Sequence, residues 1–187
     1  MNPPVIIDKT FSDKDYSNLK NYIISKNIKS LNYDKTFGRY SSNDTKFDEY
    51  AKILLPIARK IFNSATLVPS YSMFAYYEGD SSLFKHKDTN ACTYTIDFCF
   101  YQNRAWGLWV DGKEYILNSN QSLAYYGNDQ EHWRESIPDK ESQHVAMIFF
   151  HFVEPDHWWV TKGRSYLDVI TGKLSEEEWE QKNRPLS

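Results

Sequence analysis

A histidine and an aspartate stand two residues apart in the segment FKHKDT, as His86 and Asp88. Side chains at this spacing in extended chain emerge on the same face, roughly 6–7 Å apart, so both converge on one ion. Imidazole and carboxylate are both common metal ligands. A third ligand must come from elsewhere, and His132 in the later segment GNDQEHWRE is the candidate. We therefore predict that His86, Asp88 and His132 bind a metal and form the catalytic centre.

Two histidines and one carboxylate on one side of an ion leave about three coordination positions open, a pattern typical of non-haem Fe(II) oxygenases. A 2-oxo acid fills two of these positions and O2 the third, which leads to oxidation of a C–H bond. The H-x-D pair alone is a weak signal, because a surface turn usually explains it. The context strengthens it: Tyr76 and Gly79 precede the pair, an alternating strand follows it, and His132 opens another strand after a turn.

The elements that must position these residues change character along the chain. Ser12 and Asp15 resemble a helix cap, and the apolar stripe of Tyr16, Leu19, Tyr22 and Ile23 predicts a helix. A second helix is expected from residue 43 or 44, with a kink or restart at Pro56.

From Val68 onward the apolar residues alternate as in strands, and turn residues such as Asp111-Gly112 separate the segments. Seven or so short strands after a helical start predict a mainly β protein, a jelly roll or double-stranded β-helix with N-terminal helices. The expected organisation is one domain, with a helical N-terminal region at 1–66, a jelly-roll core at 67–155 and a C-terminal extension at 156–187. A short helix is expected after Ser175, in capping-box spacing with Glu178.

Composition excludes several functional classes. A length of 187 residues fits one domain, and a net charge of -3 disfavours a stable nucleic-acid partner. The start of the sequence lacks the pattern of a signal peptide, and no apolar run is long enough to cross a membrane, so a cytoplasmic protein without membrane contact is expected. Cys92 and Cys99 are at odd spacing in a strand-like segment, which disfavours a disulfide between them.

The region from Ser70 to Glu154 resembles the 2-oxoglutarate/Fe(II) oxygenase family, in particular its small prolyl-4-hydroxylase-like bacterial and phage members. The resemblance is carried by the segments YYEGDSSLFKHKD, TYTIDFCF, WGLWVDGKEYIL, AYYGNDQEHWRE and AMIFFHFVE. It implies a double-stranded β-helix with the metal between two sheets, His86 and Asp88 as near ligands and His132 as the far one. It also implies Fe(II), 2-oxoglutarate and O2 as cofactors, with Tyr76 bonded to the co-substrate.

One departure from the family concerns the remote carboxylate of 2-oxoglutarate. Family members often place Arg or Lys on the last barrel strand, but HVAMIFFHFVE contains neither. Arg134 is the candidate replacement, because it lies two residues after His132 and faces the same side of an extended strand. Pairing of Arg134 with Glu131 or Glu135 at the rim is the alternative.

Other polar residues are weaker candidates. Asp97 lies within an apolar strand and needs a partner or a wet cavity, so it is a candidate for substrate binding. Arg104 and Trp106 follow in a loop and are candidates for lining the mouth of the site, although a loop arginine is usually only solvated. His144 and His151 lie on an apolar strand, where histidine is more often a hydrogen-bonded core residue; His151 is retained as a candidate for cofactor binding.

The leading hypothesis is hydroxylation of an amino-acid side chain, free or within a peptide or protein. One rival is a dioxygenase that modifies a nucleobase. Another is a non-catalytic metal-binding jelly roll that acts as a sensor or interaction module.

Overall fold

The computed structural model describes residues 2–183. The chain divides into two compact units, residues 1–153 and 154–187. The first unit contains every strand of the described chain and both long helices. It therefore holds all the predicted site residues.

The larger of two sheets in the first unit has seven antiparallel strands. In spatial order they are β1 (Val5–Ile7), β9 (Gln121–Tyr125), β6 (Tyr94–Gln102), β11 (Val145–Val153), β4 (Val68–Tyr77), β3 (Arg39–Ser42) and β2 (Asn32–Asp34). The central strand β11 is buried along its whole length because both faces of the sheet are covered. This explains why its sequence is a nearly continuous apolar run.

The smaller sheet has four antiparallel strands: β5 (Leu83–His86), β10 (His132–Arg134), β7 (Leu108–Val110) and β8 (Lys113–Tyr115). Asp111 and Gly112 join β7 to β8 with positive φ angles of 48° and 78°, the backbone that a tight hairpin turn requires. Leu108 and Val110 pack against Met147 of the larger sheet in one buried cluster. The two sheets thus enclose a core between them, which confirms the predicted jelly roll.

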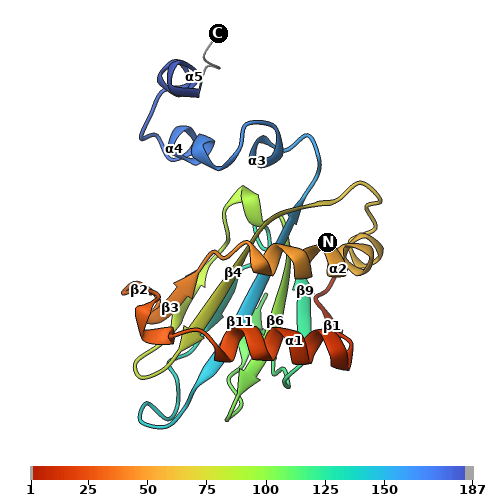
Figure 1. The fold of residues 1–187 in the computed structure, drawn as a ribbon, viewed down its shortest axis with the longest axis vertical. Coiled ribbons are helices and arrows are strands. Elements are labelled where there is room, and N and C mark those ends of the chain that lie inside the picture. The colour runs from red at the N-terminus through yellow and green to blue at the C-terminus, as the bar shows by residue number, and fades with distance from the viewer. Residues whose placement is uncertain (1, 184–187) are drawn as a thin grey trace. The chain divides into compact units, whose positions relative to one another are not determined.

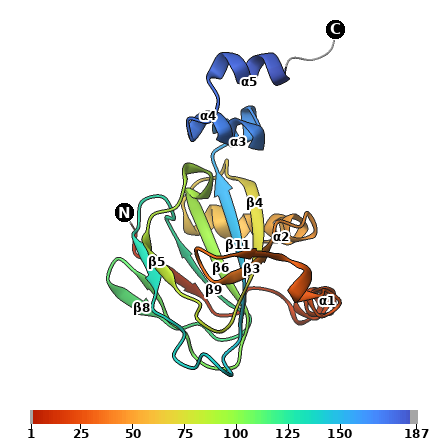
Figure 2. The same cartoon turned by 90° about the vertical axis from the view of Figure 1, so that its left-hand side faces the viewer.

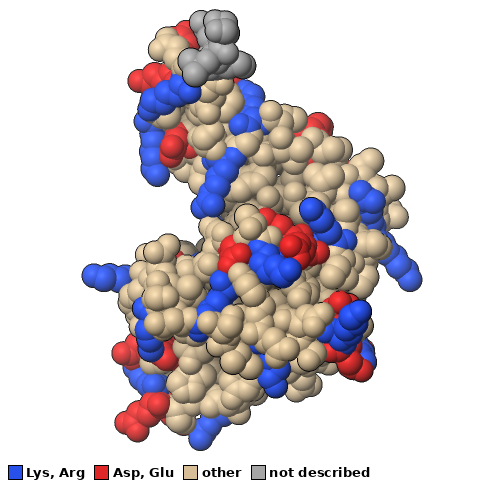
Figure 3. Space-filling model, in the orientation of Figure 1, with Lys and Arg blue, Asp and Glu red and all other residues tan. Residues whose placement is uncertain are grey.

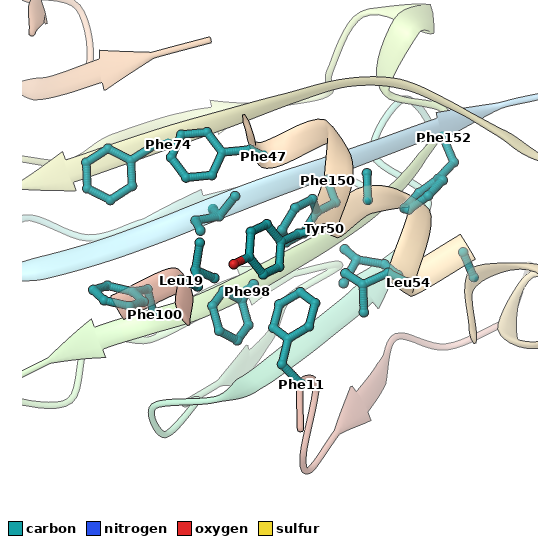
Figure 4. Close-up of a cluster of buried hydrophobic side chains, with 14 of the residues drawn as sticks. Phe11, Leu19, Phe47, Tyr50, Leu54, Phe74, Phe98, Phe100, Phe150 and Phe152 are labelled. Carbon is teal, nitrogen blue, oxygen red and sulfur yellow. The ribbon is translucent and has the colours of Figure 1, made fainter. Parts of the chain in front are cut away.

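The outer face of the larger sheet is covered by α1 (Asp13–Ile24) and α2 (Lys46–Ile61) (Figure 1). Figure 2 shows these helices on one side of the sheet and β5 and β8 on the other. Their apolar faces meet a layer of aromatic rings from the strands, drawn in Figure 4. The labelled members are Phe11, Leu19, Phe47, Tyr50, Leu54, Phe74, Phe98, Phe100, Phe150 and Phe152.

Several local predictions are confirmed. Ser12 caps α1 and accepts a hydrogen bond from the Asp15 amide, and the two cysteines are free and buried. Helix α2 begins at Lys46, slightly later than expected, and continues through Pro56 without a restart.

The strands β1, β2 and β3 were not expected within the N-terminal region that was predicted to be helical. They extend both edges of the sheet: β1 pairs with β9 and β3 pairs with β4. Such short strands show little alternation by themselves; β7 and β8, equally short, could be recognised because the Asp111-Gly112 turn joins them.

The second unit is helical. It contains α3 (Trp158–Thr161), α4 (Leu167–Ile170) and α5 (Glu176–Asn183), with a short 3-10 helix at Arg164–Tyr166. Ser175 and Glu178 exchange backbone-to-side-chain hydrogen bonds at the start of α5, which confirms the predicted capping box. Among the described helices, none has the length and apolarity needed to cross a membrane.

Candidate metal centre

The three predicted ligands meet at one end of the smaller sheet. His86 ends β5 and His132 begins β10, and these antiparallel strands place the two residues directly opposite each other. Asp88 follows β5, where its amide donates a hydrogen bond of 2.9 Å to the carbonyl of Gly127. Strand pairing fixes the histidines, and this one backbone bond fixes the aspartate beside them.

The ligand atoms of these residues converge. The Nε2 atoms of His86 and His132 lie 3.5 and 3.6 Å from the same oxygen, Oδ1 of Asp88. All three ligand atoms lie within 4.8 Å of one another. Two atoms bound at right angles to one ion, each at roughly 2.0–2.2 Å, lie roughly 3 Å apart. The set therefore needs only a small contraction to bind one ion on a single face.

Backbone carbonyls orient both imidazoles. Nδ1 of His86 donates to the carbonyl of Phe84 at 2.8 Å, and Nδ1 of His132 donates to that of Gln130 at 2.9 Å. A carbonyl only accepts, so Nδ1 carries a proton in each ring and Nε2 is the atom turned toward the metal position. Such outer partners are characteristic of metal-binding histidines.

The electrostatics of the site favour an ionised Asp88. Burial alone would raise the pKa of Asp88, but its interactions with His132 and His86 outweigh burial and hold that pKa well below its usual range. Burial lowers the pKa of His132, but its contact with Asp88 reverses this and raises it. The charged carboxylate is the form that binds a cation.

A cavity of about 260 Å³ opens beside the three ligands. It lies between the sheets and is lined by aromatic, apolar and charged side chains. Besides the ligands, these are Phe37, Arg39, Tyr71, Met73, Leu83, Lys87, Thr89, Asp97, Tyr125, Phe149 and His151. The site thus has room for more than an ion.

Of the candidate residues, Asp97 and His151 line this cavity. Burial raises the pKa of Asp97 to about 7. Oδ1 of Asp97 has no hydrogen-bond partner, whereas Oδ2 accepts a hydrogen bond from the Tyr125 hydroxyl at 3.3 Å.

Burial lowers the pKa of His151 to about 4, so its imidazole is neutral near pH 7. His151 also lies with Asp88 and Cys92 in a second group of mutually close ligand atoms.

Tyr76 and His144 are on the other face of the larger sheet. The Tyr76 hydroxyl and Nδ1 of His144 are 2.9 Å apart. Tyr76 lines a separate, more apolar cavity of about 460 Å³ that includes residues of α1. The structure therefore does not bring Tyr76 together with His86 and His132.

Arg134 faces the interior, as its spacing from His132 predicts, and is almost fully buried. Its Nη1 donates to the carbonyl of Trp106 at 2.6 Å, and its guanidinium lies 4.9 Å from the centre of the Trp106 ring. Neither Arg134 nor Trp106 lines the cavity. Arg104 lies outside it as well, largely exposed, with an ion pair to Asp139 at 2.8 Å.

Several further cavity residues were not identified from the sequence, among them Phe37, Arg39 and Tyr71. Phe37 and Arg39 belong to the hairpin formed by β2 and β3, which was not predicted from the sequence. The one available signal was an arginine in the brief polar and aromatic run GRYSS. Its place beside the metal ligands follows only from the pairing of β3 with β4.

The donor set fits Fe(II). Two imidazoles and one carboxylate on one side, with a cavity on the other, are the ligand types and open geometry of non-haem iron oxygenases. The second ligand group is less suitable for iron, because burial raises the pKa of Cys92 to about 12 and so disfavours the thiolate that binds metal.

Solved structures share this fold. A viral collagen prolyl hydroxylase from Paramecium bursaria Chlorella virus 1, in complex with 2-oxoglutarate, superposes with a TM-score of 0.59 at 11% identity, over 81% of this chain and 95% of that one. HygX from Streptomyces hygroscopicus, with nickel and 2-oxoglutarate bound, gives 0.62 at 11% identity, over 82% and 83%. A prolyl-4-hydroxylase from Pseudomonas putida gives 0.60 at 9% identity, over 79% and 91%.

At sequence level, no family model and no curated protein matches the chain. The structural similarity establishes the fold: the chain has the jelly roll of the 2-oxoglutarate/Fe(II) oxygenases, as the sequence resemblance implied. The similar structures include SnoN, a 2-oxoglutarate-dependent epimerase of nogalamycin biosynthesis, with a TM-score of 0.61 at 9% identity, over 81% of this chain and 77% of that one. Proteins with this fold therefore catalyse more than one type of reaction.

Proposed function

We propose that the protein is an Fe(II)- and 2-oxoglutarate-dependent dioxygenase that hydroxylates an amino-acid side chain, free or within a peptide or protein. The observation that carries this proposal is the convergence of His86 and His132 on one oxygen of Asp88, beside an open cavity. Structures of the same fold hold 2-oxoglutarate with nickel, or iron.

His86, Asp88 and His132 hold the iron in this proposal. With 2-oxoglutarate and O2, Fe(II) held there would supply oxidation of a C–H bond, with the 2-oxo acid converted to succinate and CO2. The protein's own contribution is to orient the ligands through the carbonyls of Phe84 and Gln130. The cavity between the sheets would shield a bound metal partly from water, which would strengthen polar contacts there.

Asp97 is the proposed residue for substrate binding. It lines the cavity, and its Oδ1 is buried without a hydrogen-bond partner. A buried polar atom in this state is satisfied when a donor arrives, so an N–H or O–H group of a substrate fits it. The Arg104 side chain is outside the cavity and is a weaker candidate.

An amino-acid side chain is favoured as the substrate over a nucleobase. Two of the similar structures are prolyl hydroxylases. On the face shown in Figure 3, basic and acidic side chains are interspersed, without a broad basic area. Nucleic-acid binding typically requires such an area.

The test has two stages. Anaerobic protein with Fe(II) and 2-oxoglutarate is expected to show the weak visible charge-transfer band of chelation. After admission of O2, amino acids and peptides are screened by mass spectrometry for the gain of one oxygen, with succinate measured in parallel. A protein that binds metal but shows neither the band nor succinate formation is instead the non-catalytic sensor or interaction module.

A further inference from the structure

Arg39 brings a cation from outside the jelly roll into the cavity beside the metal ligands. It begins β3, the strand added to the edge of the larger sheet next to β4, and lies opposite Tyr77. Within the described chain, the Lys and Arg side chains that line this cavity are Arg39 and Lys87. Lys87 is exposed, whereas only 12% of the Arg39 side chain is accessible.

The guanidinium of Arg39 is incompletely paired. Nη1 donates to the Tyr77 hydroxyl at 3.0 Å, but Nε is buried without a hydrogen-bond partner. The acid that it approaches is Asp34, whose Oδ2 is 3.9 Å from Nη2, beyond hydrogen-bond distance. A buried arginine normally meets a carboxylate through parallel N–H bonds. Asp34 is at ion-pair distance only, so a carboxylate bonded in this way is lacking among the described residues and would fit the cavity.

Phe37 links this cation to the metal ligands. Its ring centre is 4.4 Å from the Arg39 guanidinium carbon and 6.0 Å from the centre of the His86 ring. Leu83 and Phe149 line the same cavity and make its wall apolar. A carboxylate in such a place needs a cation, and the low local dielectric strengthens the resulting bond.

Arg134 is the competing cation. It is buried between the sheets, but its Nη1 already donates to a backbone carbonyl, and it does not line the cavity. The positive charge of Arg134 acts on the buried acid Asp97. Burial raises the pKa of Asp97, and Arg134 lowers it by a smaller amount. Arg134 is therefore bonded to the protein's own backbone and stands outside the cavity lining.

We propose that Arg39 binds the remote carboxylate of 2-oxoglutarate, the one that does not chelate the metal. The inference rests on the proposed function and deepens it, since it assigns the co-substrate's charged end to a residue of the added hairpin. The guanidinium supplies a planar pair of donors, and Phe37 holds it in place from one side.

The test compares two 2-oxo acids of equal chain length, 2-oxoglutarate and 2-oxopentanoate, which has a methyl group in place of the remote carboxylate. Each is titrated anaerobically into the Fe(II) protein, and the charge-transfer band gives its Kd. Wild type is expected to prefer 2-oxoglutarate by at least about thirtyfold. Arg39→Gln should bring the ratio of the two Kd values close to one, and Arg39→Lys should restore part of it.

Two further variants complete the design. Arg134→Gln should keep the wild-type preference, and Lys35→Gln removes an exposed charge from the same hairpin as the matched control. Because the ratio is measured within each variant, a general loosening of the site cancels out.

Retention of the wild-type ratio by Arg39→Gln overturns the inference. If that variant keeps the ratio but loses product formation, Arg39 contacts the substrate that is hydroxylated and not 2-oxoglutarate. Loss of the ratio in Arg134→Gln with Arg39→Gln unaffected overturns it in favour of Arg134. Absence of the band with both acids in wild type rejects the proposed function itself, a result distinct from a band without discrimination.

Discussion

Gly127 lies directly against Asp88. Its carbonyl accepts the Asp88 amide at 2.9 Å, and a Cβ built on Gly127 would be 2.7 Å from Oδ2 of Asp88. The same Cβ would be 2.5 Å from the carbonyl oxygen of Cys92 and 2.5 Å from the Thr95 hydroxyl. Glycine is thus required because the backbone at 127 forms part of the wall that holds the carboxylate.

Gly127→Ala should displace Asp88 and weaken metal binding by roughly 10- to 100-fold, the usual effect of disturbing the support of a ligand. Isothermal titration of the metal-free protein with Fe(II) under anaerobic conditions, or with Mn(II), measures this. Gly107→Ala is the matched control, because a Cβ there meets the side chain of Glu114 and no ligand. Unchanged metal affinity in Gly127→Ala would show that the loop relaxes around the methyl group.

His132→Ala should abolish retention of iron and turnover of 2-oxoglutarate together, since it removes one of three ligands. Metal content after anaerobic loading and desalting, with succinate formation, gives both readouts. Trp133→Phe is the control, because the neighbouring ring stacks on Trp109 and does not line the cavity. Full activity of His132→Ala would remove the metal assignment.

Asp97 should make the stability of the metal-free protein depend on pH. Burial raises its pKa to about 7, above the value of roughly 3.9 in an unfolded chain. The native state therefore binds this proton more tightly, so the stabilisation is complete below about pH 3.9 and is lost as the pH rises through about 7.

Asp97→Asn removes this titration. The variant should match wild type near pH 4 and exceed it near pH 8 by on the order of 4 kcal/mol in the free energy of unfolding. Thermal or urea unfolding in the presence of a chelator measures the difference, and Asp129→Asn, at an exposed site, is the control. His151 titrates with the opposite sign but is present in both proteins, so it cancels. A difference that is constant from pH 4 to 8 would contradict the assignment.

Phe11 should be one of the most sensitive core positions. It is 1% exposed, and its ring centre lies 5.4 Å from Tyr50, 5.0 Å from Phe98 and 6.0 Å from Phe150. Phe11→Ala should lower the free energy of unfolding by about 3–5 kcal/mol through the cavity that it leaves. Urea denaturation with an unchanged m-value would show this, and Ile24→Ala, at an exposed position on α1, should have little effect. Metal affinity should persist, because this core is on the far side of the sheet from the ligands.

Much of the fold is encoded in local pattern. The Ser12 cap, the Ser175 and Glu178 capping box and the Asp111-Gly112 turn each depend on contacts within a few residues. The alternation from Val68 onward likewise follows from which faces of each strand are buried. Such features can be predicted from sequence because their causes are close together in the chain.

The candidate ligands were also predictable by type. The two-residue spacing of His86 and Asp88 suggested a shared face, and His132 was proposed because its segment begins a strand after a turn. Asp88 itself follows β5 and is fixed by its amide bond to Gly127. Their convergence to 3.5 and 3.6 Å depends on the pairing of β5 with β10.

Only the tertiary structure decided what surrounds the metal ligands. Parity within β4 puts Tyr76 on the helix-covered face, and the pairing of β3 with β4 brings Arg39 into the cavity from a segment with almost no sequence signal. Gly127 reads in sequence as an ordinary turn residue, although its missing side chain makes room for Asp88. The sequence by itself determined which residues have the chemistry of ligands and which segments form elements, because both depend on residue type and short spacing. The pairing of strands that are distant in the sequence decided which residues surround those ligands: the cation Arg39, the apolar wall of the cavity and the backbone of Gly127. This pairing depends on how distant segments pack, which residue type and short spacing do not determine.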